Sequence, residues 1–269
     1  MSDIQLGFIG AGNMAEAIAR GILRAAVLAP EEMIATDPDA ERRRLFIDAL
    51  GIEAVEENEQ VVERAPCVLV AVKPQVFDKA VAPVGSRFGP DSLLISICAG
   101  VSTRHIEELV AGGTRVVRAM PNAPMVVGRG IVALSAGASA TEEDLAAAER
   151  LLGAAAEVIR VPEDLMDAVT AVSGSGPAYF FYLAELLAAA GAEAGLPKDQ
   201  AKYLARVTFE GAARLLAESG EEPETLRRKV TSPGGTTEAA IRTFDALGFK
   251  KMVAEAVRAA RDRGRELGR

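Results

Sequence analysis

The stretch from Leu6 to Ala15 constrains this chain most, because a short apolar run is followed there by closely spaced small residues. Gly10, Gly12 and Ala15 come directly after the run, and helix-favouring residues follow them. This order predicts a strand, a tight turn and the start of a helix in the G-x-G-x-x-A arrangement that binds a dinucleotide. Gly10 permits the turn, Gly12 lets backbone approach a pyrophosphate, and Ala15 lets the helix pack near the strand.

Apolar runs that suit strands alternate with segments that suit helices as far as Pro162. The run 67–72 is apolar throughout, which is typical of a strand buried on both faces of a parallel sheet. Strands are predicted at 4–10, 32–37, 52–55, 67–72, 93–98, 115–120, 130–134 and 157–161, and helices at 13–25, 39–50, 58–65, 75–84, 102–110 and 141–154. Asn58 is expected to cap its helix. The first half is therefore predicted to be an α/β domain of the Rossmann type, with a mostly parallel sheet of about eight strands.

The pattern changes after Pro162, where strands disappear and Ala and Leu dominate. Helices are predicted at 163–171, 177–194, 197–218, 223–229, 236–247 and 249–267. Two domains follow, a dinucleotide-binding domain at 1–162 and an all-helical domain at 163–269. The helix beginning at Pro177 is apolar on nearly every side and must be enclosed. The helical domain is too small to enclose it alone, so we expect a homodimer whose helical domains interlock.

Composition excludes several classes of protein. Hydrophobic residues make up 49% and charged residues 25%, and no segment reaches the roughly 20 uninterrupted apolar residues of a membrane span. The start Met1-Ser2-Asp3 lacks the basic and then apolar pattern of a signal peptide, so a cytoplasmic location is expected. The net charge of −8 argues against a nucleic-acid partner.

Cysteine and histidine usage narrows the chemistry. Cys67 and Cys98 both fall in apolar runs, where a free thiol behaves as a small hydrophobe, so neither a disulfide nor a metal site is expected. The single histidine, His105, lies near a helix start that Ser102 can cap, which favours an ordinary surface histidine. We therefore expect chemistry that does not use a histidine acid.

Asp37 ends the second predicted strand, where nucleotide-binding domains present a group to the adenosine ribose. A carboxylate there accepts hydrogen bonds from ribose hydroxyls and repels a 2′-phosphate. Arg42, Arg43 and Arg44 follow in the next helix and either bind such a phosphate or form a solvated helix face. The choice between NADH and NADPH stays open at this level.

Two further segments fall at the same predicted edge of the sheet. Lys73-Pro74 follows the central strand 67–72, a position where open sheets bind ligands, although a plain surface lysine is equally compatible. The loop 120–124 carries Pro121 and Pro124 around Asn122. A rigid loop at this edge is a candidate wall of a nicotinamide pocket.

Two glycine-rich loops interrupt the helical half, at 173–177 and 231–237. Gly, Pro, Ser and Thr at such places often serve only to end and begin helices. Each loop nevertheless sets hydroxyl groups beside free backbone N–H groups at a helix N-terminus, which suits a carboxylate ligand. We favour the ligand-binding interpretation for 232–237.

Five separated motifs together resemble those of the pyrroline-5-carboxylate reductase family, over essentially the whole chain. Related reductases share the first motif but not the last two. The motifs are Gly7-Phe8-Ile9-Gly10-Ala11-Gly12-Asn13-Met14, Ala71-Val72-Lys73-Pro74-Gln75, Met120-Pro121-Asn122-Ala123-Pro124, Ser173-Gly174-Ser175-Gly176-Pro177-Ala178-Tyr179 and Ser232-Pro233-Gly234-Gly235-Thr236-Thr237.

The resemblance implies hydride transfer from NADPH or NADH to the C=N carbon of 1-pyrroline-5-carboxylate, giving L-proline. It also implies dimers and often rings of dimers. With the positional reasoning above, the expected cofactor contacts are Ile9, Gly10, Ala11, Gly12, Asn13, Met14, Asp37, Asn58, Ala71, Val72, Lys73, Pro74, Pro121 and Asn122. The expected substrate contacts are Ser175, Ser232, Gly234, Gly235, Thr236 and Thr237, with the Thr237 hydroxyl bonding the ring nitrogen. Asp37 departs from the family pattern and weakens an NADP assignment.

Two alternatives compete with this interpretation. A β-hydroxyacid dehydrogenase would carry a lysine that acts as the catalytic acid in the helical domain, but residues 162–196 contain no lysine. A nucleotide-sensing protein without turnover is the other, and it would not oxidise the cofactor when the imine is added.

Overall fold

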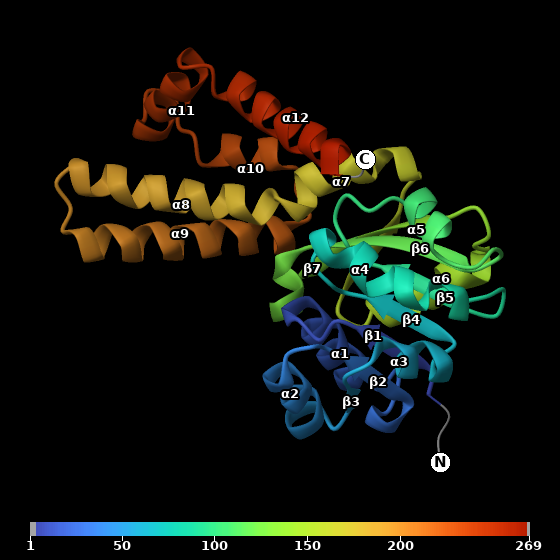
Figure 1. The fold of residues 1–269 in the computed structure, drawn as a ribbon. Helices are drawn as coiled ribbons and strands as arrows, with labels where there is room; N and C mark the ends of the chain where they lie inside the picture. The colour runs from blue at the N-terminus through green and yellow to red at the C-terminus, as the bar shows by residue number, and fades with distance from the viewer. Residues whose placement is uncertain (1–3, 268–269) are drawn as a thin grey trace. The chain divides into compact units, whose positions relative to one another are not determined.

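The computed structural model describes residues 4–267, which form two compact units. One unit comprises the described residues up to Ser175 together with those from Ala260 onward, and the other comprises Gly176–Ala259. The first unit holds the sheet and the second is helical (Figure 1).

The eight-stranded sheet of the described chain confirms the predicted architecture of the first half. Its strands are β1 (Leu6–Ile9), β2 (Met33–Thr36), β3 (Glu53–Val55), β4 (Cys67–Val70), β5 (Leu93–Ser96), β6 (Arg115–Pro121), β7 (Gly130–Ala136) and β8 (Ala156–Arg160). They lie in the order β3-β2-β1-β4-β5-β6-β7-β8, and every neighbouring pair is parallel except β6 with β7. Because β1, β2 and β4 are parallel neighbours, the segments that follow them meet at one edge of the sheet.

Helices cover both faces of the sheet. They are α1 (Asn13–Arg24), α2 (Ala40–Leu50), α3 (Asn58–Arg64), α4 (Phe77–Val81), α5 (Thr103–Leu109), α6 (Glu142–Leu152) and α7 (Met166–Val169). Side chains of α1, α2 and α6 pack on one face, and those of α3, α4 and α5 pack on the other. As predicted, Ser102 caps α5 by accepting a hydrogen bond from the His105 N–H at 3.2 Å. His105 itself is partly exposed beside Asp78.

Two predicted helices are broken into shorter pieces. The segment 75–84 consists of a 3₁₀ turn at Pro74–Val76, then α4, then a second 3₁₀ segment at Ala82–Arg87, where Pro83 cannot donate the hydrogen bond that would continue α4. The segment 163–171 consists of a 3₁₀ turn at Glu163–Leu165, then α7, then a π-helical turn at Thr170–Gly174. That turn closes where the Ser175 N–H donates to the Thr170 carbonyl at 2.8 Å.

The helical unit matches the predicted segments closely. It contains α8 (Gly176–Glu193), α9 (Lys198–Ser219), α10 (Pro223–Lys229), α11 (Thr236–Ala246) and the greater part of α12 (Phe249–Leu267). Helices α8 and α9 lie side by side as an antiparallel pair (Figure 1), with Phe180 and Phe209 in contact between them. Much of their apolar surface is exposed in the single chain, Phe181 to 67%. An exposed apolar surface of this kind marks a site of interaction with another molecule.

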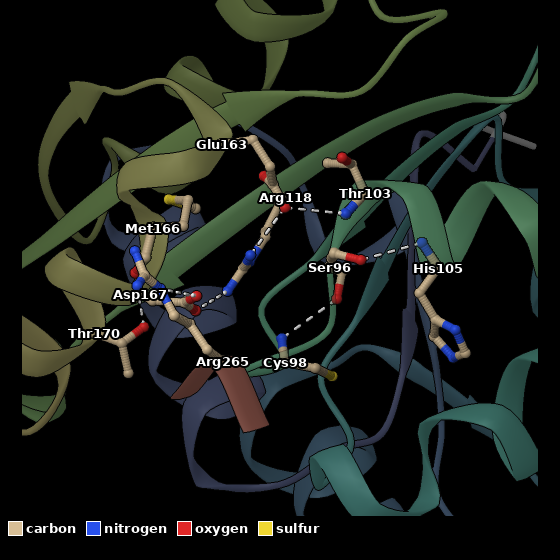
Figure 2. Close-up of polar contacts among 11 residues, drawn as sticks. Ser96, Cys98, Thr103, His105, Arg118, Glu163, Met166, Asp167, Thr170 and Arg265 are labelled. Carbon is tan, nitrogen blue, oxygen red and sulfur yellow. Dashed lines mark hydrogen bonds and ion pairs between the residues drawn. The ribbon is translucent and has the colours of Figure 1, made fainter. Parts of the chain in front are cut away.

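A buried ionic cluster ties β6 to the segment before α7 and to the last turn of α12 (Figure 2). Arg118 is 4% exposed, and its Nη1 donates to Glu163 Oε1 at 2.9 Å. Its Nη2 lies 3.5 Å from Asp167 Oδ1, and Arg265 Nε lies 3.9 Å from the other oxygen of Asp167. Glu163 Oε1 also accepts the Thr103 N–H, whereas Glu163 Oε2 is buried without a partner among the described residues.

Both cysteines are buried and free. Burial raises the pKa of Cys67 to about 12 and that of Cys98 to about 11, so both thiols stay protonated near neutral pH. Cys98 lies two residues beyond the end of β5 rather than within it. In the part of the chain that the structure describes, no helix is long and apolar enough to cross a membrane.

Candidate functional site

A cleft of about 550 Å³ opens at the carboxyl edge of β1, β2 and β4. The strands are joined at this edge by the hydrogen bonds from Gly10 N–H to Thr36 O and from Ala71 N–H to Ile9 O, at 2.9 and 2.8 Å. The cleft is lined by Ile9, Gly10, Gly12, Thr36, Asp37, Pro38, Glu56, Glu57, Asn58, Glu59, Ala71, Val72, Lys73, Val76, Lys79, Ala80, Pro83 and Val84. Eight of the fourteen expected cofactor contacts are therefore brought together in one hollow.

The glycine turn after β1 leads into α1 without a side chain that caps the helix. Gly12 precedes α1 in extended conformation and contributes no side-chain cap, so the first N–H groups of α1 have no capping side chain. Glycine at this position also leaves open space, since a Cβ built on Gly12 would have no atom within 4 Å. A helix N-terminus of this kind suits a phosphate.

Asn58 lines the cleft, but the prediction that it caps α3 is wrong. Asn58 is the first helical residue. Glu57 occupies the N-cap position, and its side chain makes no capping hydrogen bond. The Asn58 side chain instead accepts a hydrogen bond from the Thr36 hydroxyl at 2.5 Å and donates to the Ala80 carbonyl at 3.0 Å. It thereby joins the end of β2 to the end of α4 across the cleft wall.

The other expected cofactor residues border this region. Ala11 is buried, Asn13 and Met14 begin α1, and Pro74 begins the turn after Lys73. Pro121 ends β6, and Asn122 follows it. The Asn122 side chain accepts the Ile131 N–H at 3.0 Å and donates to the Ser173 hydroxyl at 3.3 Å. Asn122 is thus held by two contacts, of which the one to Ser173 reaches the first glycine-rich loop.

Residues that were not predicted from the sequence also line the cleft. Glu56 and Glu57 follow β3, and Lys79 lies on α4. The parallel pairing of β3 with β2 was the available signal, because it carries the residue after Val55 to the same edge as Asp37.

The second glycine-rich loop lies in the helical unit and leads into α11. Gly234 adopts a φ of +72°, and Gly235 precedes α11 without a side-chain cap. The Gly234 N–H donates to Glu238 Oε2 at 2.8 Å, so one donor of the loop is already engaged. Thr237 lies in the first turn of α11 and is partly buried. Ser232, Thr236 and Gly235 complete the loop that was predicted to bind a carboxylate.

Among residues 4–267, no three His, Cys, Asp or Glu side chains are grouped so that they could hold a metal ion.

The parallel sheet, the glycine turn and the cleft define the NAD(P)-dependent oxidoreductases of the Rossmann type. Residues 5–100 match the family model described as "NADP oxidoreductase coenzyme F420-dependent". Residues 163–267 match the one described as "Pyrroline-5-carboxylate reductase dimerisation". The chain belongs to the pyrroline-5-carboxylate reductase family, which confirms the resemblance.

Relatives match this chain over nearly its full length. The pyrroline-5-carboxylate reductase of Synechocystis is 43% identical, with 99% of both chains covered. That of Arabidopsis thaliana is 40% identical, with 98% of this chain and 96% of the relative covered. Among solved structures, the pyrroline-5-carboxylate reductase of Coxiella burnetii superposes with a TM-score of 0.89 at 34% identity, with both chains fully covered. The Plasmodium falciparum enzyme, solved with NADP bound, has a TM-score of 0.86 at 28% identity over the whole of both chains.

Proposed function

We propose that this protein reduces 1-pyrroline-5-carboxylate to L-proline, with NADPH or NADH as the hydride donor. The observation that carries the proposal is the full-length relationship to pyrroline-5-carboxylate reductases, in a chain whose own glycine turn borders a cleft of dinucleotide type. The reaction fits the residue inventory, because the single histidine lies outside the cleft lining.

The reaction requires little general acid catalysis from the protein. Protonation of the ring nitrogen gives the substrate C=N bond a positive charge, which makes its carbon electrophilic. A bound reduced nicotinamide supplies the hydride that adds to this carbon, and the protonated nitrogen becomes the secondary amine of proline. The residues of the protein then act by binding, orientation and exclusion of water.

For the cofactor, we assign the N–H groups at the start of α1 to the pyrophosphate, with Gly12 leaving the space for it. Asn58 and the Ala71–Pro74 turn border the dinucleotide along the cleft, and Pro121 with Asn122 forms the nicotinamide wall. This assignment rests on the shared edge of β1, β2 and β4 and on the fixed Asn122 side chain.

For the substrate, we assign the carboxylate to the loop 232–237, with Ser175 as a further contact. The uncapped start of α11 offers N–H groups to an anion, and Ser232 and Thr236 add hydroxyls. The Thr237 hydroxyl is assigned to the ring nitrogen, where it orients the imine for hydride addition.

The activity can be tested directly on the purified full-length protein. We expect NADH or NADPH to be oxidised only when 1-pyrroline-5-carboxylate is added, with proline formed in equal amount. Nucleotide binding without oxidation under these conditions would favour the nucleotide-sensing alternative.

Replacing Thr237 tests the substrate assignment. We expect Thr237→Ala to lower turnover by roughly ten- to a thousandfold, because a positioned polar contact to the reacting group is lost. Thr237→Ser should restore most of the rate. Thr243→Ala is the matched control, since Thr243 is exposed on the same helix and its hydroxyl donates to the Ala239 carbonyl. Unchanged kinetics in Thr237→Ala would remove Thr237 from the reaction.

We also propose that the helical domain forms a homodimer, as the exposed apolar surface of α8 and α9 requires. The mass of the assembly in solution distinguishes an isolated dimer from a ring of dimers. The cytoplasmic location stays a prediction.

A further inference from the structure

The carboxylate of Asp37 is held at the end of β2 by two backbone donors. Oδ2 accepts the Ala11 N–H at 2.8 Å, and Oδ1 accepts the Asp39 N–H at 2.9 Å. Each oxygen of a carboxylate has two lone pairs, so each retains capacity for one more donor. The side chain lines the cleft and is therefore fixed where it can accept hydrogen bonds from a sugar hydroxyl.

Arg42 is engaged elsewhere. Its Nε donates to the Ala11 carbonyl at 2.6 Å, and its Nη2 donates to Glu16 Oε2 at 2.9 Å. Although burial raises the pKa of Glu16, the hydrogen bonds from Arg20 and Arg42 outweigh it and lower that pKa. The guanidinium is thus committed to a carboxylate and a carbonyl on the α1 side.

Arg43 is similarly committed. Its Nη1 donates to the carbonyls of Asp37 and Pro38 at 2.8 and 3.1 Å, and its Nη2 pairs with Glu56. Arg44 is exposed. Not one of the three arginines after Asp39 is among the described residues that line the cleft.

The charge of the cleft is therefore uneven. The acidic side chains that line it are Asp37 after β2, then Glu56 and Glu57 after β3 and Glu59 at the start of α3. Its basic side chains, Lys73 and Lys79, follow β4, which is separated from β2 by β1 in the sheet. A phosphate bound beside β2 would meet the carboxylate of Asp37, whereas the nearby guanidinium of Arg43 is already engaged by two carbonyls and by Glu56.

We propose that Asp37 makes this protein selective for NADH over NADPH, by bonding the adenosine ribose hydroxyls and repelling a 2′-phosphate. The inference rests on the proposed function, since it assigns the cleft to that cofactor. The proposal concerns this chain alone, and the Plasmodium falciparum relative was solved with NADP bound.

The test is equilibrium titration of the full-length protein with NADH and with NADPH, in the absence of imine. We expect the wild type to bind NADH at least about tenfold more tightly, because the extra phosphate lies within reach of an unneutralised carboxylate. Asp37→Asn keeps the size of the side chain and removes its charge, and Asp37→Ser also makes room. Both should shift the ratio of dissociation constants toward NADPH by about tenfold or more.

Asp48→Ser is the matched control, because Asp48 is an exposed carboxylate on the same helix as the arginines and lies outside the cleft lining. It should leave the ratio unchanged. Equal binding of the two nucleotides by the wild type, tighter binding of NADPH, or an unchanged ratio in both Asp37 variants would overturn the inference while leaving the proposed reaction standing. Failure of both nucleotides to bind would overturn the proposed function and this inference with it.

Discussion

Gly10 and Gly12 stand two residues apart in the turn after β1, and different physical constraints act on them. Gly10 has a φ of +96°, and a Cβ built there would lie 3.0 Å from the backbone of Ala71. Its requirement for glycine comes from the protein's own backbone and packing. Gly12 has an ordinary φ of −69° and open space around its Cβ position. The fold alone does not demand glycine there, whereas a bound pyrophosphate would.

Alanine at each position should separate these two roles. Gly12→Ala is expected to reduce the free energy of unfolding by less than about 1 kcal/mol, the difference between Gly and Ala at a helix N-cap. It should nevertheless weaken NADH binding by about tenfold or more, which corresponds to about 1.4 kcal/mol.

Gly10→Ala should instead lower the free energy of unfolding by at least about 1 kcal/mol, because a side chain is forced into a left-handed conformation. Denaturant unfolding and nucleotide titration of both variants provide the measurement. A Gly12→Ala protein that binds NADH as tightly as the wild type would contradict the phosphate assignment.

Among the elements, β6 and α7 depend on side-chain charges as well as on backbone pairing. Arg118 on β6 is almost fully buried between Glu163 and Asp167, and these carboxylates are 30% and 21% exposed. Gly264 of α12 lies close enough to Asp167 that an added Cβ would be 3.4 Å from its Oδ1. Arg118 therefore fixes how three segments distant in sequence meet within one unit.

We expect Arg118→Met to lower the free energy of unfolding by about 3 kcal/mol, at the low end of the range for a broken buried ion pair, because its carboxylates are partly exposed. Adding Glu163→Gln should recover part of the loss, since one uncompensated charge is then removed. Arg104→Met is the control, because the pair of Arg104 with Glu108 is exposed on α5. Such a pair contributes about 0.3–0.5 kcal/mol. Equal effects of the two arginine substitutions in denaturant unfolding would refute the role of the cluster.

The positions of most elements could be predicted from sequence, because apolar periodicity and end signals are local. The helices at 223–229 and 249–267 agree with the structure at both ends. The misjudged segments, 75–84 and 163–171, each contain a feature that breaks regular hydrogen bonding, Pro83 in one and the π-helical turn in the other. The sequence of each segment favours a helix, but the break in regular hydrogen bonding makes the α-helix shorter than predicted.

At the scale of the whole molecule, the apolar side chains of α8 and α9 point to a second copy of the chain. Phe180 contacts Phe209 within the chain, whereas the neighbouring Phe181 is 67% exposed. The family model that covers this region is a dimerisation domain. Burial of such aromatic side chains is the main source of binding energy in protein interfaces.

Phe181→Glu should therefore weaken the assembly, raising its dissociation constant by at least about 30-fold if Phe181 is a central contact. Light scattering over a range of protein concentrations measures the change. Ile47→Glu is the control, because Ile47 is 48% exposed on α2, outside the helical domain. A Phe181→Glu protein with the wild-type mass at every concentration would place the interface elsewhere.

The sequence by itself determined the two-part architecture, the glycine turn and the family, because each is written in local patterns of a few residues. Only the tertiary structure decided what the charged and polar side chains of the site contact. The Ala11 N–H meets Asp37 across 26 positions of the chain, and Arg118 meets Glu163 across 45. Likewise Arg42 and Arg43, for which the sequence left phosphate binding open, are engaged by Ala11, Glu16 and Glu56. Hydrogen bonds and ion pairs act over a few ångströms in space, and local sequence patterns carry no record of which distant residues will share that space.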